Sequence, residues 1–186
     1  MEAVRTVCLL LAAGLLGACT AQRSEVAQPG GPPPVEELTQ LPPTFADTQA
    51  LRPLEAFASG AGKTVYVPVY SHVYYLDGRQ HLLAATLSIR NTSLKEPILV
   101  TSVRYYNSEG FLVKEYTQKD LQIPPMATAD FFVEQDDTSG GSGANFLVKW
   151  KALKGASLPI VEAVMVSTSS GQGISMISPG RVVEED

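Results

Sequence analysis

The sequence predicts an all-β fold: an antiparallel sandwich that follows an N-terminal export signal and a proline-rich linker. From about residue 63, short runs of β-branched and aromatic residues are separated by Gly, Pro, Asn and Asp, which is typical of consecutive strands. Several runs alternate apolar and polar residues, as around Phe146, Val148 and Trp150. No helical period lies between the runs. This favours a single immunoglobulin-like sandwich of about seven or eight strands, with a closed barrel as the alternative.

Eight strands are expected in the domain, each bounded by turn residues. The alternation is clearest in 82–90 and in 145–152, so each of these strands should have one buried and one wet face. Trp150 is the expected anchor of the core. The eight ranges are 64–70, 82–90, 98–106, 111–116, 128–135, 145–152, 160–168 and 174–183.

The first eighteen residues have the pattern of a secretory signal. Arg5 precedes an apolar run, 6–16, that is too short to cross a bilayer as a helix, since a crossing needs about twenty residues. Residues 16–19 read Leu-Gly-Ala-Cys and resemble the lipobox of bacterial lipoproteins, in which cleavage precedes a lipid-bearing cysteine. We therefore expect Cys19 to carry acyl chains such as palmitate. A plain secretory signal or an N-terminal membrane anchor is the alternative.

Lipidation also accounts for how the chain uses cysteine. Its two cysteines are Cys8, inside the signal, and Cys19, so the body of the protein has no disulfide framework. Several acyl chains anchor a protein stably, because each buried methylene contributes about 0.8 kcal/mol. Thr20 and Ala21 follow the cysteine, and the absence of Asp at the second position resembles lipoproteins sorted onward to the outer membrane. We expect a cell-envelope protein, lipid-anchored to a membrane, with the outer membrane facing the periplasm as its location.

A proline-rich tether is expected between the lipid and the domain. Residues 20–60 hold 7 of the 13 prolines. At about 3.1 Å per residue in an extended polyproline conformation, such a stretch reaches on the order of 100 Å. Residues 51–58 are expected to form a helical turn or to dock on the domain. The expected organisation is a signal at 1–18, the lipidated Cys and tether at 19–62, the sandwich at 63–183 and an acidic tail at 184–186.

The charge distribution excludes one class of partner. The formal net charge is −5, and a nucleic-acid binder would carry a strongly basic face. Residues 61–183 contain 11 Lys+Arg and 10 Asp+Glu, so the acidity belongs to the tether and the tail. Nucleic acid is therefore not expected as a partner. An envelope protein or a glycan is expected to be recognised through shape and hydrogen bonding.

Strand parity predicts which loops lie together. If successive strands run up and down, loops 71–81, 107–110, 136–144 and 169–173 share one end of the sandwich. Loops 91–97, 117–127 and 153–159 share the other end. The first group is the richer in polar side chains, and loops on a rigid scaffold commonly carry function. Its candidate binding residues are His72, Asp136, Asp137, Thr138, Ser139, Ser142, Asn145, Ser169 and Ser170.

The run Asp-Asp-Thr-Ser-Gly-Gly-Ser-Gly-Ala-Asn at 136–145 has three interpretations. Its glycines allow a nest of backbone N–H groups, but Asp136 and Asp137 would repel an external anion and accept those hydrogen bonds themselves. A structural loop that satisfies its own polar groups is therefore favoured. A cation site built from the two carboxylates and loop carbonyls, such as a calcium site, and a polar recognition loop for a glycan or protein remain alternatives.

Catalysis is the less favoured interpretation of the same loops. A Ser/His/Asp arrangement of Ser139 or Ser142 with His72 is conceivable, but the serines lack the strand-to-helix context of a nucleophile elbow. His72 lacks metal-ligand spacing and fits a hydrogen-bonded strand-end residue. No cofactor is expected. Six tyrosines either form an exposed aromatic face or are half-buried cross-strand partners: Tyr66, Tyr70, Tyr74, Tyr75, Tyr105 and Tyr106.

Four strings in the domain resemble a known bacterial family. They are TVYVPVYSHVY at 64–74, ATLSIRNTS at 85–93, DTSGGSGANFLVKW at 137–150 and PIVEAVMVSTSSGQGISMISPGRV at 159–182. Over about residues 63–182 the chain resembles the domain of unknown function 3124 family. The resemblance implies a small, usually exported domain with no established activity or ligand, so no functional residue is carried over. We expect a non-enzymatic binding module, with a serine hydrolase or a calcium-binding module as the alternative.

Overall fold

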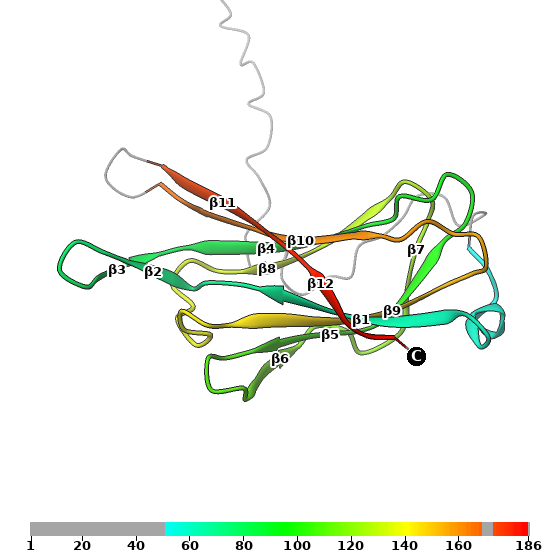
Figure 1. Ribbon diagram of the computed structural model, residues 1–186, viewed down its shortest axis with the longest axis horizontal. Coiled ribbons are helices and arrows are strands. Elements are labelled where there is room, and N and C mark those ends of the chain that lie inside the picture. Colours follow the sequence, from blue (N-terminus) through cyan, green and yellow to red (C-terminus); the bar gives the residue numbers. More distant parts are fainter. Residues whose placement is uncertain (1–50, 169–172, 186) are drawn as a thin grey trace, which may run out of the picture. The chain divides into compact units, whose positions relative to one another are not determined.

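The computed structural model describes residues 51–168 and 173–185, which form the predicted antiparallel β-sandwich (Figure 1). One short 3-10 helix, η1 (Leu54–Phe57), precedes the strands. Twelve strands are formed by the described residues. They are β1 (Ala61–Pro68), β2 (His72–Tyr75), β3 (Arg79–Leu82), β4 (Ala84–Arg90), β5 (Ile98–Tyr106), β6 (Leu112–Glu115), β7 (Leu121–Ile123), β8 (Thr128–Val133), β9 (Asn145–Ala152), β10 (Ile160–Ser167), β11 (Ile174–Pro179) and β12 (Arg181–Glu185).

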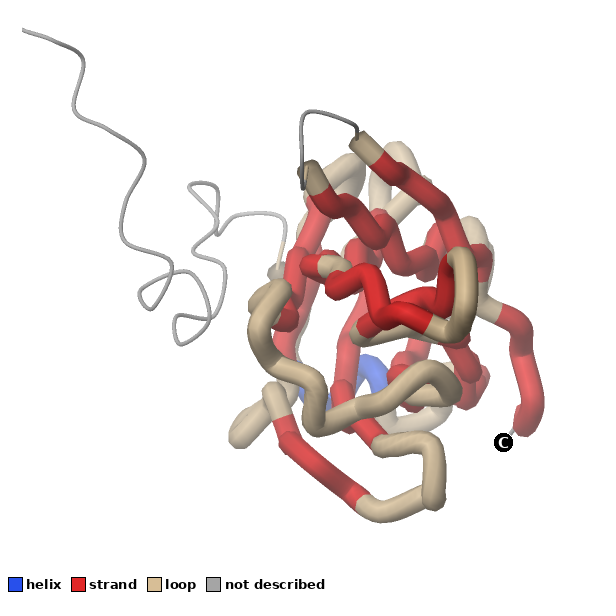
Figure 2. Tube along the Cα trace, turned by 90° about the vertical axis from the view of Figure 1, so that its left-hand side faces the viewer, coloured by secondary structure: helices blue, strands red, loops and turns tan. Residues whose placement is uncertain are grey.

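Two sheets form the sandwich. The larger sheet has six strands in the order β12-β1-β9-β5-β6, with β7 also paired to β5, and the smaller sheet has the order β11-β10-β4-β8. β2 and β3 form a separate hairpin that projects from one end of the sheets (Figure 1). Figure 2 views the domain from that end, with η1 on the far side.

The core lies between the sheets and follows the predicted alternation. In β9, Phe146, Val148 and Trp150 are buried while Lys149 is exposed, which confirms Trp150 as a core residue. Burial of such a side chain contributes about 1.5–3 kcal/mol. The largest fully buried side chains are Tyr105, Phe57, Phe146, Leu83, Leu87, Ile89, Ile98, Ile123, Met165, Val67, Val69 and Val100.

The prediction of eight strands was too low for the described residues. Two expected strands, 98–106 and 145–152, have the predicted bounds. The expected loop 71–81 instead contains the hairpin of β2 and β3, and the expected loop 117–127 contains the three-residue β7. The hairpin buries few side chains and β7 is very short, so neither has a clear alternating pattern in the sequence.

The expected strand 174–183 is divided at Gly180, where the chain passes from the smaller sheet to the larger. The N–H group of Gly180 donates to the carbonyl of Val161 at 2.8 Å. A Cβ at this position would lie 2.6 Å from Cγ1 of Val65 and 2.7 Å from the Val161 carbonyl oxygen. Only glycine fits between the two sheets here, and the pair Pro179-Gly180 is a turn signal for the change of sheet.

Both ends of the folded domain extend past the expected bounds of 63–183. Residues 51–58 dock on the domain and form η1, as expected, with Phe57 buried. Arg52 N donates to Gln122 Oε1 at 2.9 Å. The expected acidic tail contributes to β12, where Glu184 and Glu185 are opposite Thr64 and Lys63 of β1. In the described part of the chain, no helix has both the length and the apolarity needed to cross a membrane.

The two groups of loops lie at opposite ends of the sandwich, as strand parity predicts (Figure 1). We call the end with residues 70–81, 107–111 and 134–144 the loop end. We call the other end, with 91–97, 116–127 and 153–159, the tether end, because the described chain enters the fold there at Leu51. Residues 169–172 lie outside the described residues.

Candidate functional site

The β8–β9 loop is the centre of the loop end, and two serines hold it. The N–H and the hydroxyl of Ser71 both donate to the carbonyl of Gly141, at 3.1 and 3.0 Å. On the other side, the N–H of Ser108 donates to the carbonyl of Gly140 at 2.9 Å, and its hydroxyl oxygen accepts from the N–H of Gly143 at 2.9 Å. Three loops that are far apart in sequence therefore meet, as predicted.

The hydrogen bonds within this loop match the structural interpretation of the Asp-Asp-Thr-Ser run. The carboxylate of Asp137 accepts from the N–H of Ser139 at 3.0 Å and also from its hydroxyl. The N–H of Gly141 donates to the carbonyl of Thr138 at 3.1 Å. The carbonyls of Gly140 and Gly141 already accept bonds from Ser108 and Ser71. Among the described residues, no group of three His, Cys, Asp or Glu side chains is placed to hold a metal ion.

Tyr105 lies beneath the glycine-rich loop and explains one of its glycines. A Cβ at Gly140 would lie 1.8 Å from the Tyr105 hydroxyl oxygen, so any larger residue there would displace the tyrosine or the loop. The Tyr105 hydroxyl is buried and has no hydrogen-bond partner among the described residues. Burial, together with the nearby charge of Asp137, raises the pKa of Tyr105 to about 12. The loop end therefore contains a buried polar group that the fold does not satisfy.

His72 is a second buried residue with an unpaired polar atom. Its Nδ1 is 3.1 Å from the hydroxyl oxygen of Ser71. The Ser71 hydroxyl is also within hydrogen-bond distance of the Gly141 carbonyl, at 3.0 Å. Nε2 is buried without a hydrogen-bond partner among the described residues, and the ring lies beside that of Tyr74. His81 also has a buried, unpartnered Nε2.

The Ser/His/Asp arrangement considered as the alternative has no hydrogen-bonded counterpart among the described residues. Ser139 donates to Asp137, and His72 Nδ1 is engaged by Ser71. In the described part of the chain, no hydrogen bond joins Ser139 or Ser142 to His72.

The remaining candidate residues occupy the same end with different exposures. Asp136, Thr138 and Ser139 are exposed, whereas Ser142 and Asn145 are half-buried. Ser169 and Ser170, and also the expected lipidation residue Cys19, lie outside the described residues.

Exposed aromatic side chains gather around the loop end. They come from the β1–β2 connection, the β2–β3 hairpin and the β5–β6 turn: Tyr70, Tyr74 (60% exposed), Tyr75 and Phe111 (70% exposed). The three tyrosines were among the six considered for an aromatic face. Phe111, expected to begin a strand, was missed. Its place is set by Asn107, whose carboxamide oxygen accepts from the Phe111 N–H at 2.8 Å.

Leu76, at the tip of the hairpin, was also missed. It is 79% exposed and has a φ of 44°, in the left-handed region. A branched apolar residue is unfavourable there, by roughly 1–2 kcal/mol. The pair Asp77-Gly78 in the sequence predicts the turn, but it does not indicate that an apolar residue, Leu76, lies exposed at the tip.

Comparison with known proteins identifies the family. No curated protein matches the sequence. A crystal structure of Thermotoga maritima 1070 is similar to the chain with 13% sequence identity and a TM-score of 0.37, over 66% of this chain and 95% of that chain. Residues 62–183 match the family described as "Protein of unknown function (DUF3124)". The chain belongs to this family, as the four strings in its sequence indicated.

Proposed function

We propose that this protein is a lipid-anchored envelope lipoprotein whose sandwich binds an envelope protein or glycan through the loop end, without catalysing a reaction. The observation that carries this proposal is the separation of the two ends. The described chain enters at the tether end, where Arg52 contacts Gln122 and Glu96, whereas the exposed aromatic side chains lie at the other end. A domain joined to a lipid through residues 19–50 would thus present its loop end away from the point of attachment.

The chemistry of the loop end supports a binding role. Tyr74 and Tyr75 offer large, amphipathic and rather rigid contact surfaces, and such residues are enriched where proteins bind partners. Aromatic faces also stack on the apolar faces of sugars. The polar β8–β9 loop of the same end, with Asp136 and Thr138 exposed, supplies hydrogen-bonding groups. A partner that contacts the aromatic side chains would bury area that the fold itself leaves exposed.

Leu76 strengthens this interpretation, because its position is costly for the folded domain. An exposed leucine with positive φ gains little from burial and strains the backbone. Residues that are unfavourable for stability are commonly retained where they contact a partner. The proposal therefore assigns Leu76 to the contact surface with the tyrosines.

A matched pair of variants tests the binding surface. Leu76→Asn places a residue that tolerates positive φ at the hairpin tip. Met126→Asn makes the same change at the tether end, where Met126 has a φ of 61° and is 66% exposed. We expect in-cell crosslinking followed by affinity capture to lose its specific partner in Leu76→Asn and to keep it in Met126→Asn. Capture that is unchanged in Leu76→Asn and Tyr75→Ser would rule out this surface.

The lipid anchor is tested separately. In Cys19→Ser we expect metabolic labelling with an alkyne fatty acid to disappear and the protein to leave the membrane fraction. Cys8→Ser is the control, because the other cysteine lies inside the expected signal and its loss should leave labelling unchanged. Retained labelling in Cys19→Ser would contradict the proposed localisation without bearing on the loop end.

A further inference from the structure

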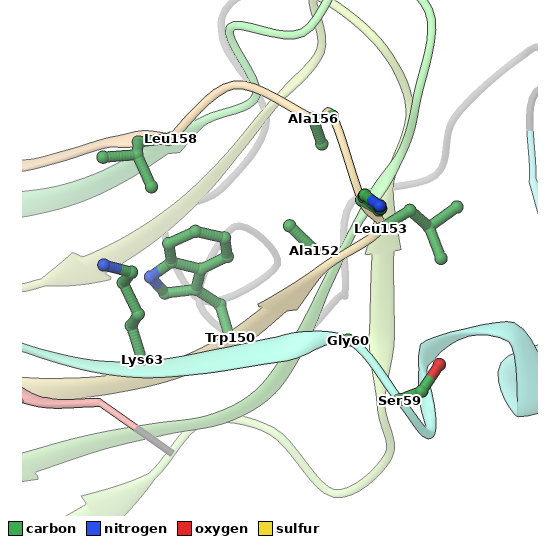
Figure 3. Close-up of a pocket in the computed structure, with 10 residues that line it drawn as sticks. Ser59, Gly60, Lys63, Trp150, Ala152, Leu153, Ala156 and Leu158 are labelled. Carbon is green, nitrogen blue, oxygen red and sulfur yellow. The ribbon is translucent and has the colours of Figure 1, made fainter.

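A pocket of about 360 Å³ opens at the tether end, away from the surface proposed above (Figure 3). Its walls come from the segment after η1, the start of β1, the end of β9 and the β9–β10 loop. The lining residues are Ser59, Gly60, Lys63, Trp150, Ala152, Leu153, Lys154, Gly155, Ala156 and Leu158. They are mostly apolar, with two lysines and no acidic side chain among them. The volume is at the lower end of the range for small-molecule sites.

Lys63 faces this pocket because of its position in β1. It has the same parity as the buried Val65 and Val67, so its side chain lies on the inner face of the sheet. Strand pairing places Trp150 of β9 directly opposite Lys63 on one side, and Glu185 of β12 opposite it on the other. A charged residue at a core-facing position is unusual, and here it lies at the open mouth of the core.

The indole of Trp150 supplies a second, independent observation. The side chain is 3% exposed, and its Nε1 atom is buried without a hydrogen-bond partner among the described residues. In Figure 3 this nitrogen lies on the side of the ring that faces the Lys63 ammonium group. Leaving a buried donor unpaired costs roughly 1–3 kcal/mol. Two donors therefore face one another, and only Lys63 has an acceptor, the carboxylate of Glu185.

We propose that this pocket binds a small amphiphilic anion, with an acidic head at Lys63 and Trp150 and an apolar body along Leu158, Ala152 and Ala156. An anionic oxygen between the two donors would satisfy the Trp150 N–H and form a charge-assisted bond with Lys63. Lys154 adds a second positive charge at the rim. A carboxylate or a phosphate ester on an aliphatic chain has this chemistry. The site is independent of the binding role of the loop end.

Trp150 is the only tryptophan of the chain, so its fluorescence reports on the pocket directly. The full domain is titrated with octanoate below its micelle concentration, and with octyl phosphate to separate the two head groups. Octanol and octylamine have the same chain with a neutral and a cationic head. We expect saturable changes in fluorescence with one or both anions and none with the amine. Equal binding of octanol and the anions, or no saturable change with either anion, would overturn the proposal.

Variants then test the assigned residues by calorimetry. Lys63→Met should weaken binding of the anion by at least about tenfold, because it removes a charge-assisted hydrogen bond. Lys149→Met changes the neighbouring, outward-facing lysine of β9 and should leave affinity unchanged. Glu185→Gln should strengthen binding, because it frees Lys63 from its ion pair. Thermal melting verifies that each variant is folded. A folded Lys63→Met with unchanged affinity, or weaker binding in Glu185→Gln, would contradict the assignment.

Discussion

The two ends of this sandwich differ in how they treat buried polar groups. At the tether end, the buried carboxamide of Asn91 donates to the carbonyls of Glu96, Ile123 and Pro124 at 2.9 to 3.0 Å and accepts from the N–H of Ser93 at 2.9 Å. One side chain thus joins two loops. At the loop end, His72, His81 and Tyr105 each keep a buried polar atom without a partner among the described residues, whereas the tether end has one such atom, Nε1 of Trp150 in the pocket.

The two ends therefore differ in how many of their buried polar groups form hydrogen bonds. Satisfied polar networks stiffen a structure, whereas unpaired groups cost stability and are typically retained where function requires them. The two ends also differ in the kind of apolar side chain that they expose. The tether end exposes aliphatic residues such as Leu94, Met126 and Leu158, and the loop end exposes mainly aromatic residues. Outside the pocket, the tether end is the better satisfied of the two, and an aromatic loop end with several unpaired groups is what a presented binding surface requires.

The largest expected effect is the loss of the Asn91 network. Asn91→Ala removes all the hydrogen bonds of this buried side chain, so we expect the free energy of unfolding to fall by about 3 kcal/mol. Asn145→Ala is the matched change at the loop end. The Asn145 side chain forms no hydrogen bond with the described residues, so this variant should lie within about 0.5 kcal/mol of the wild type. Urea denaturation measures both, and equal losses would erase the proposed difference between the ends.

Two tyrosines, Tyr116 and Tyr105, allow a paired and an unpaired hydroxyl to be compared directly. The Tyr116 hydroxyl donates to the carbonyl of Phe132 at 3.0 Å, so Tyr116→Phe should lower the free energy of unfolding by about 1 kcal/mol. Tyr105→Phe removes a buried hydroxyl that has no partner and should leave stability unchanged or raise it by up to about 1 kcal/mol. The same denaturation series checks the signs. A loss in Tyr105→Phe as large as that in Tyr116→Phe would show that the Tyr105 hydroxyl is in fact satisfied.

Leu76 and Met126 both have a positive φ, and relieving this backbone strain should raise the free energy of unfolding slightly. Leu76→Asn and Met126→Asn each place asparagine where φ is positive, so each should raise the free energy of unfolding by up to about 1 kcal/mol. Thermal melting compares them with the wild type. The two gains should be similar, although only Leu76→Asn is expected to affect partner capture. A marked loss of stability in Leu76→Asn would mean that the leucine serves folding rather than binding.

The last expected effect appears only at alkaline pH. The ordinary pKa of tyrosine is near 10, and burial raises the pKa of Tyr105 to about 12. Below pH 10 both the folded and the unfolded chain keep this proton. Between about pH 10 and 12 only the unfolded chain loses it, so the free energy of unfolding falls as pH rises through this window. In Tyr105→Phe this contribution is absent, and denaturation from pH 9 to 12 should show a shallower decline than the wild type. Parallel declines would contradict the raised pKa.

The parts of the fold that follow alternation were predictable from the sequence. β5 and β9 lie deep in the larger sheet, so their buried faces impose a regular apolar pattern that marks their bounds. The hairpin of β2 and β3 has little to bury, and its pattern is set by backbone pairing instead. The change of sheet at Gly180 depends on close packing against Val65, which is a long-range contact and has no local pattern beyond the Pro-Gly pair.

The candidate site was predictable in location but not in chemistry. Parity brought the correct loops together, because it follows from antiparallel order alone. Which polar groups are already paired depends on contacts such as Ser108 with Gly140, which join residues far apart in the sequence. The pocket at the tether end did have a sequence signal. Lys63 shares the parity of Val65 and Val67, so a charged residue at a core-facing position marked it.

The most direct test of the central claim is site-specific photocrosslinking in cells. A photoreactive amino acid replaces Tyr75 at the loop end or, as a control of similar type and exposure, Tyr66 on the outer face of β1. The account predicts a discrete crosslinked species, protein or glycan, from position 75 and none from position 66. The same species from both positions, or a discrete species from position 66 alone, would contradict binding through the loop end.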